Sequence, residues 1–141
     1  MAIHALVIIC ANALFSMRGF KEYSFFERYK FNINSLNNGD FKRLFSSGFL
    51  HLDWQHLLFN MLTLYFFTHS VVLQLGVFNF YLIYFISLLT GNLLSFWFHK
   101  KESNYSAVGA SGAVTGIVYA AILLNPGMKM FIYFIPIPLP S

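Results

Sequence analysis

Charged residues are scarce in this sequence: only 10% of its 141 residues are Asp, Glu, Lys or Arg. A soluble domain carries about 25% charged residues, whereas here 57% of the residues are hydrophobic and 20% are aromatic. Water is therefore not the expected main solvent, and residues 1–141 are interpreted as one membrane-embedded domain.

Cysteine and clusters of basic residues are also scarce, which argues against a disulfide-bonded, a metal-binding or a nucleic-acid-binding protein. The single Cys10 cannot form an internal disulfide, and no second ligand stands at a metal-binding spacing from it. The net charge of +4 is spread over loops, and the pair Lys100-Lys101 is typical of residues that flank a membrane span. We expect no nucleic-acid partner, no metal and no cofactor.

Long apolar segments, in contrast, are abundant. Residues 1–17, 55–75 and 78–98 are each apolar enough for a transmembrane helix, and the third would be about 31 Å long, which matches a bilayer core. Residues 107–124 form a shorter fourth segment that is rich in Gly and Ala. The expected fold class is therefore all-α, a polytopic membrane helix bundle with four transmembrane helices present.

The two ends of the chain need separate interpretation. A cleaved signal peptide is the alternative for residues 1–17, but the absence of Lys and Arg before Arg18 favours a retained helix. After the turn signal Asn125-Pro126-Gly127, residues 125–141 are interpreted as the approach to a further helix and the start of a truncated region.

Residues 18–54 form a long connection with too many aromatic residues for a disordered linker. We expect this loop to lie half-buried in the membrane interface. Within it, Ser24 to Tyr29 favours a short amphipathic helix, and Asp40 is a candidate N-cap for a second helix that runs to Phe45.

Polar side chains cluster where the second apolar segment begins. His56 and Asn60 are spaced i, i+4, so they share one helix face and could both donate hydrogen bonds to a developing negative oxygen. The alternative is that they brace the first loop or a neighbouring helix. A metal site of His51, Asp53 and His56 is a further option, but the spacing differs from the His-Glu-x-x-His helix that binds zinc.

The fourth segment contains the run Gly109-Ala110-Ser111-Gly112. The glycines allow a sharp turn and a close helix approach, and Gly112-x-x-x-Gly116 is a small-residue packing pattern. If the helix begins near Ser111, its free N–H groups and positive dipole end point at that hydroxyl. The alternative is a helix-start serine in a packing motif. The Gly-x-Ser-x-Gly elbow of soluble hydrolases does not match, because it needs a preceding strand.

Together, these motifs resemble those of the rhomboid family of intramembrane serine proteases. The matching residues are His51-x-x-x-x-His56-x-x-x-Asn60 on the second helix and Gly109-x-Ser111-Gly112 opening the fourth. The run from Trp54 to Met61 also looks like the family's entry to its second helix. The order of the elements matches as well: first helix, long interfacial loop, second helix, third helix and serine helix.

The resemblance implies an endopeptidase that cleaves transmembrane segments through a Ser–His dyad. Ser111 would be the nucleophile, and His56, Asn60 and the backbone N–H of Ser111 would bind the oxyanion. His51, Gly109 and Gly112 would support the site. The implied partners are transmembrane protein substrates and the lipid bilayer, and the implied location is a bacterial inner (cell) membrane.

One departure from the family pattern concerns the general base, which in the family is a histidine on a sixth helix. None of the five histidines of this chain stands in that place. With four helices of an expected six, the sequence resembles the front of such a protease, and we expect the 141-residue chain to be inactive. One alternative is a catalytically inactive relative that binds transmembrane clients, and another is an ordinary membrane protein whose polar residues pack helices.

Two lines of reasoning disagree on membrane orientation. Eight of the nine Lys and Arg residues lie in the first loop or around Lys100, and the positive-inside rule would place this side in the cytoplasm. The family resemblance implies that the active site opens away from the cytoplasm. We favour the resemblance, because Glu22, Glu27 and Asp40 can partly neutralise the charge of the first loop.

Overall fold

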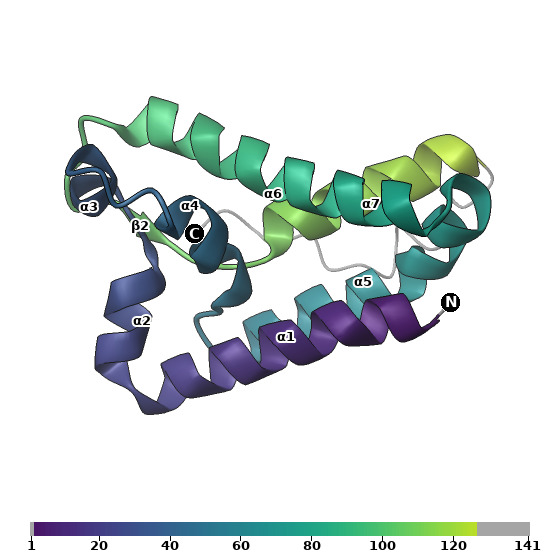
Figure 1. Ribbon diagram of the computed structural model, residues 1–141, viewed down its shortest axis with the longest axis horizontal. Coiled ribbons are helices and arrows are strands. Elements are labelled where there is room, and N and C mark those ends of the chain that lie inside the picture. Colours follow the sequence, from purple (N-terminus) through teal and green to yellow (C-terminus); the bar gives the residue numbers. More distant parts are fainter. Residues whose placement is uncertain (1, 127–141) are drawn as a thin grey trace.

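The computed structural model describes residues 2–126, and these form a helical bundle with one very short strand pair (Figure 1). In chain order the elements are α1 (Ala2–Lys21), α2 (Tyr23–Tyr29), β1 (Phe31–Asn32), α3 (Ile33–Asn37), α4 (Arg43–Ser46), the 3-10 turn η1 (Ser47–Phe49), α5 (Trp54–Leu75), α6 (Val77–His99), β2 (Ser106–Ala107) and α7 (Ser111–Leu124). The all-α fold class expected from the sequence is confirmed.

Three of these helices are long and apolar enough to cross a membrane: Ile3–Lys21, Trp54–Leu75 and Val77–His99. Helix α7 has 14 residues, so its length is about 21 Å. That is shorter than the hydrocarbon core of a bilayer, about 30 Å. Many large apolar side chains face outward, among them Leu14, Phe66 and Trp97, as expected for helices that are surrounded by lipid.

The core of the bundle lies between α5, α6 and α7, with α1 packed against α5. Each of the three central helices contributes a row of buried apolar side chains: Leu57, Met61, Leu64, Phe67 and Val71 from α5, Phe80, Tyr84 and Leu88 from α6, and Ala113, Val114, Ile117 and Ala121 from α7. The small alanines of α7 allow close approach to its neighbours. Helix α7 is thereby held on two sides.

The connection from α1 to α5 is folded. Helix α1 continues to Lys21, four residues beyond Met17, and α2 then forms over the segment where a short amphipathic helix was predicted. The predicted N-cap at Asp40 is wrong: α4 begins at Arg43, and the residue before it, Lys42, makes no side-chain cap. The Asp40 carboxylate instead accepts a 2.8 Å hydrogen bond from Nε of Arg43, because this guanidinium lies only three residues away and carries the opposite charge.

Arg43 is a buried cation that fixes this loop. Its Nη1 donates hydrogen bonds to the carbonyl oxygens of Glu27 at 2.8 Å and Lys30 at 3.0 Å. The hydrogen bond from Arg43 holds the pKa of the Asp40 carboxyl below its usual value. The guanidinium therefore ties α4 to the end of α2 through two backbone carbonyl groups.

The loop after α6 is attached to the first loop. Strands β1 and β2 pair antiparallel, with Phe31 opposite Ala107 and Asn32 opposite Ser106. Both loops lie at the same end of the bundle, where α2, α3, α4 and β2 gather at the left of Figure 1. The chain that leads into α7 is thus guided by residues from the other loop.

Candidate active site

Ser111 is the first residue of α7, and no side chain caps this helix end. The preceding Gly109 has φ +130°, a conformation that favours glycine, and it turns the chain into the helix. Position 111 is exposed on the surface of the described bundle. A serine hydroxyl thus stands at a helix N-terminus where backbone N–H groups lack helical partners.

Close packing of α7 against α6 sets the depth of this serine. A Cβ on Gly91 would lie 4.0 Å from the Cα of Gly112, and one on Gly116 would lie 2.6 Å from the Cβ of Ser87. Two small residues on each helix therefore face each other. Gly91 lies eight residues before His99, the last residue of α6, or about 12 Å along the helix. The start of α7 accordingly lies about 12 Å from the end of α6 along the helix axis, although Ser111 itself is exposed.

The residues just before Ser111 are held by the first loop. Gly109 N–H donates to the carbonyl oxygen of Ser47 at 3.0 Å, and Ala110 N–H donates to Nε2 of His51 at 3.3 Å. Ser47, His51 and Ala110 are all buried. These two bonds use the N–H groups of residues 109 and 110, so the next N–H, that of Ser111, is the first one left at the helix end.

The segment from Ser47 to His51 is itself fastened to α6. Nδ2 of Asn92 donates to the carbonyl oxygen of Leu44 at 2.6 Å and to Oγ of Ser47 at 3.2 Å. A Cβ on Gly48 would lie 2.9 Å from Cγ of Leu88, so glycine is needed for this close approach. The segment that supports the start of α7 is therefore anchored on α6.

His56 lies directly against the start of α7. Asp53 caps α5, and its Oδ1 accepts a 2.8 Å hydrogen bond from the N–H of His56. The imidazole reaches Gly109, where an added Cβ would come within 2.7 Å of Cε1 and 2.9 Å of Nε2. Its Nδ1 accepts the N–H of Leu52 at 3.3 Å. In a neutral ring the proton is then on Nε2, the nitrogen that faces α7.

Asn60 follows His56 by one helical turn and is half-buried. Within residues 2–126, its amide makes no side-chain hydrogen bond, and neither does the hydroxyl of Ser111. Helices α5 and α7 pack on each other along their length. Asn60 and Ser111 thus belong to two neighbouring helices and both have hydrogen-bonding groups to offer.

His51 has both ring nitrogens engaged. Nδ1 lies 2.9 Å from Oγ of Ser16 on α1, and Nε2 accepts the N–H of Ala110. Burial, and next the nearby His56, lower the pKa of His51 to about 3. The ring is therefore neutral at physiological pH and is committed to hydrogen bonds within the protein.

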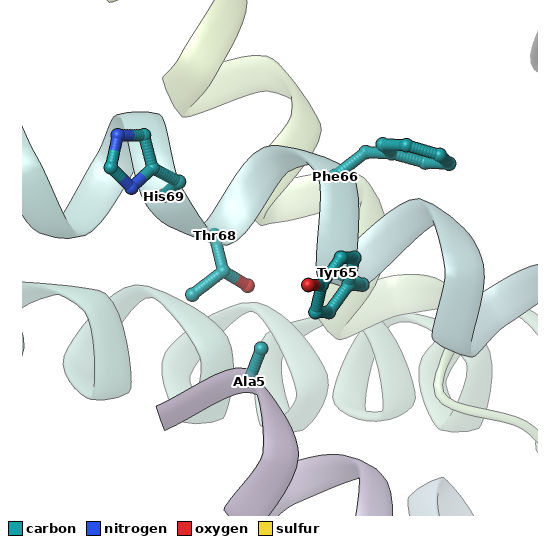
Figure 2. A pocket seen from close by; sticks show the side chains of 5 residues that line it. All are labelled: Ala5, Tyr65, Phe66, Thr68 and His69. Carbon is teal, nitrogen blue, oxygen red and sulfur yellow. The ribbon is translucent and has the colours of Figure 1, made fainter. Parts of the chain in front are cut away.

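The remaining histidines lie elsewhere. His4 Nδ1 is 3.2 Å from the hydroxyl of Tyr81, and His99 bonds to Glu102 and stacks on Tyr105 with ring centroids 3.8 Å apart. His69 lines a hollow of about 260 Å³ between α1 and α5, together with Ala5, Tyr65, Phe66 and Thr68 (Figure 2). The lining residues lie on α1 and α5, and none lies on α7, the helix that begins at Ser111. The hollow is therefore not part of the serine site.

Sequence reasoning named His51, His56, Asn60, Gly109, Ser111 and Gly112 as site residues. The structure brings His56 and Gly109 into contact and joins His51 to Ala110. Two residues that hold this arrangement, Ser16 and Ser47, were missed. A serine in a mostly apolar helix was the available signal for Ser16, because a polar group in a membrane span usually has a specific partner.

These features define a polytopic membrane protein with a serine at the N-terminus of a short internal helix, beside an imidazole from a neighbouring span. The family model named Rhomboid domain matches residues 38–140, and the chain belongs to the rhomboid family.

Curated relatives agree with this membership. The chain is 34% identical over 98 residues to Rhomboid protein 1, mitochondrial, of Saccharomyces cerevisiae, covering 67% of this chain and 28% of the yeast protein. It is 27% identical over 149 aligned positions to RHOMBOID-like protein 12, mitochondrial, of Arabidopsis thaliana, covering 94% of this chain and 44% of that protein. It is 36% identical over 95 residues to Rhomboid protease GluP of Bacillus subtilis, covering 67% and 18%. The chain spans less than half the length of each of these relatives.

Proposed function

We propose that this chain carries the nucleophile and the oxyanion-binding groups of an intramembrane serine endopeptidase that cleaves transmembrane segments of membrane proteins. The observation that carries the proposal is the contact between the His56 imidazole and Gly109, two residues before Ser111. This contact joins the motif that contains His56 to the motif that contains Ser111, and the proposed reaction requires both. A relative named a rhomboid protease supports the reaction class.

In this proposal the hydroxyl oxygen of Ser111 attacks the carbonyl carbon of a peptide bond. The carbonyl oxygen then becomes an oxyanion, which needs hydrogen-bond donors fixed in advance. Three donors are available: the backbone N–H of Ser111, the Nε2–H of His56 and the side-chain amide of Asn60. One such donor contributes about 3–4 kcal/mol to the stability of the transition state.

The proton of Ser111 must pass to a base, because an unactivated hydroxyl is a weak nucleophile. His56 is unsuited, since its Nδ1 accepts from Leu52 and its Nε2 carries the proton. We propose that the base comes from outside the described residues and packs on the exposed face of α7 formed by Ser111, Thr115 and Tyr119. On this basis we expect the 141-residue chain, taken alone, to be inactive.

The partners in this proposal are transmembrane protein substrates within the lipid bilayer. The chain is an integral membrane protein, as its three spanning helices and its family indicate. We propose a bacterial cell membrane as its location, which the relative from Bacillus subtilis supports. A mitochondrial membrane is the alternative that the names of the yeast and Arabidopsis relatives support.

A protein that binds transmembrane clients without cleaving them is the second candidate. The observation that favours it is that the hydroxyl of Ser111 makes no hydrogen bond to a histidine within residues 2–126. Such a protein would use the same exposed face of α7 for binding.

The deciding experiment compares the product of the whole gene with the 141-residue chain in proteoliposomes that contain a transmembrane peptide substrate. The proposal expects cleavage by the first, its loss in Ser111→Ala, and none by the second. Binding of the peptide without cleavage by the whole product would support the client-binding function instead. Equal fluorophosphonate labelling of Ser111 in both proteins would contradict the external base.

A further inference from the structure

A continuous chain of hydrogen bonds leads from α1 to the residue before Ser111. The hydroxyl of Ser16 donates to the carbonyl oxygen of Phe49 at 2.7 Å and lies 2.9 Å from Nδ1 of His51. On the other side of the ring, Nε2 accepts the N–H of Ala110 at 3.3 Å. Ser16, His51 and Ala110 are each 0% exposed, so water does not compete for these bonds.

The positions of the hydrogen atoms in this chain follow from the donors. A backbone N–H can only donate, so Nε2 of His51 must present its lone pair to Ala110. In the neutral imidazole the proton is then on Nδ1, which donates to Oγ of Ser16. The hydroxyl of Ser16 accepts this bond and donates a hydrogen bond to the carbonyl oxygen of Phe49. Every polar hydrogen therefore has one acceptor.

The choice of serine at position 16 fits this arrangement. A serine inside a helix commonly donates to the carbonyl four residues earlier, but here the hydroxyl reaches the first loop instead. Alanine would leave Nδ1–H of His51 without an acceptor. If the proton then moved to Nε2, that N–H would face the N–H of Ala110 and repel it.

We propose that Ser16 is a positioning residue, which acts through the His51 tautomer to hold the Ala110 N–H and thereby the first turn of α7. This inference rests on the proposed function, in which the N–H of Ser111 is an oxyanion donor. Ala110 precedes Ser111 directly, so a shift of the Ala110 peptide re-aims the Ser111 N–H. In this proposal Ser16 touches neither the substrate nor the hydroxyl of Ser111.

The first test measures the tautomer of His51 by its ¹⁵N imidazole resonances in the 141-residue chain, together with hydrogen exchange of the Ala110 amide. The wild type should show protonated Nδ1 and a protected Ala110 amide. Ser16→Ala should move the proton toward Nε2 and speed the exchange, whereas Ser16→Thr should keep the wild-type pattern because it keeps the hydroxyl. Asn12→Ala is the matched control: Asn12 is buried one turn earlier on α1 and bonds to Tyr84, not to His51.

The outcomes are separable from those of the protease proposal. A wild type with protonated Nε2, or an unchanged tautomer and Ala110 exchange in Ser16→Ala, would overturn the role of Ser16 whatever the activity. The tautomer of the wild-type protein can be measured without any variant. The inference can therefore still be refuted if the Ser16→Ala chain fails to fold. Absence of cleavage in every variant, with the tautomer shift present, would count against the proposed function alone.

The second test measures kinetics with the product of the whole gene. Ser16→Ala should lower kcat on the order of ten- to a hundredfold with KM nearly unchanged, since misplacement by about 1 Å costs rates of this size. Ser16→Thr should restore kcat. A rise in KM at unchanged kcat would contradict the inference, because it would locate the effect in substrate binding.

Discussion

The imidazole of His56 lies so close to Gly109 that no Cβ fits between them: a built Cβ comes within 2.7 Å of Cε1. Gly109 also has φ +130°, which L-residues with a side chain rarely adopt. The contact between α5 and the residues that lead into α7 therefore depends on the absence of a side chain at position 109.

Gly109→Ala should displace either His56 or the start of α7. The unfavourable φ alone costs about 1–3 kcal/mol, and the steric overlap adds to it. We expect a lower midpoint of thermal unfolding in detergent and, in the whole gene product, loss of Ser111 labelling by a fluorophosphonate. Gly39→Ala is the matched control, because Gly39 has φ +92° but open space within 4 Å. Equal effects of the two substitutions would show that the contact with His56 is unimportant.

Ser111→Ala and Asn60→Ala should differ in degree. Removal of Ser111 should abolish cleavage of a membrane-embedded substrate by the whole gene product, because the nucleophile is lost. Asn60→Ala should lower kcat by about 10²–10³, the effect of losing one oxyanion donor. Asn79→Ala serves as the control, since this exposed amide donates a hydrogen bond to the carbonyl oxygen of Leu75, four residues earlier. Full activity in Asn60→Ala would show that Asn60 is not an oxyanion donor.

The packing of α7 on α6 predicts that added side-chain volume lowers stability at Gly116 but not at Gly91. In Gly116→Ala the new Cβ would lie 2.6 Å from the Cβ of Ser87, and overpacking of this kind costs about 1–3 kcal/mol. Ser87→Gly in the same chain should recover part of the loss by making room. Gly91→Ala should be tolerated, because its nearest neighbour lies at 4.0 Å. Thermal unfolding in one detergent compares the wild type, Gly116→Ala, Gly116→Ala with Ser87→Gly, and Gly91→Ala. A lower unfolding midpoint in Gly91→Ala together with an unchanged midpoint in Gly116→Ala would refute the packing.

The stability of the protein should depend on pH through His51. Burial lowers the pKa of its imidazole from 6.5 to about 3 in the folded state. Between these values the unfolded chain binds a proton that the folded protein does not, so the free energy of unfolding falls as the pH falls. The slope is at most about 1.4 kcal/mol per pH unit from this group.

The measurement for this prediction is denaturant unfolding from pH 7 to pH 4.5 in wild type and in His51→Asn. The wild type should lose stability over this range, and the variant should lose less per pH unit, whatever its absolute stability. Identical slopes in both proteins would mean that His51 does not titrate on unfolding.

Much of the fold followed from composition alone. The apolar segments gave the all-α membrane class, because a span of about 20 apolar residues has few alternatives to a helix. The fourth segment was drawn from residue 107, whereas α7 begins at Ser111, within the run from Gly109 to Gly112 that indicated a helix start. Both inferences depend on local properties of the chain.

The features that the sequence could not reveal depend on contacts between distant residues. Asp40 was predicted as the N-cap of a helix that runs to Phe45, but Arg43 competes for its carboxylate. The partnership of Ser16 with His51 joins residues 35 positions apart, and no periodicity encodes it. The roles of His56, Asn60 and Ser111 in catalysis stay predictions, since they concern a reaction and not a shape.

The support of Gly109 and Ala110 by Ser47 and His51 also has a consequence for the expected order of assembly. The partners of the second bond are 59 residues apart in the chain, so the first loop is synthesised long before α7 emerges from the ribosome. Helix α7 is short, and its entry carries polar backbone groups that lipid cannot satisfy. We therefore expect α7 to enter the membrane onto a surface that the earlier segments have already built, so that the helix carrying Ser111 forms last among the described elements.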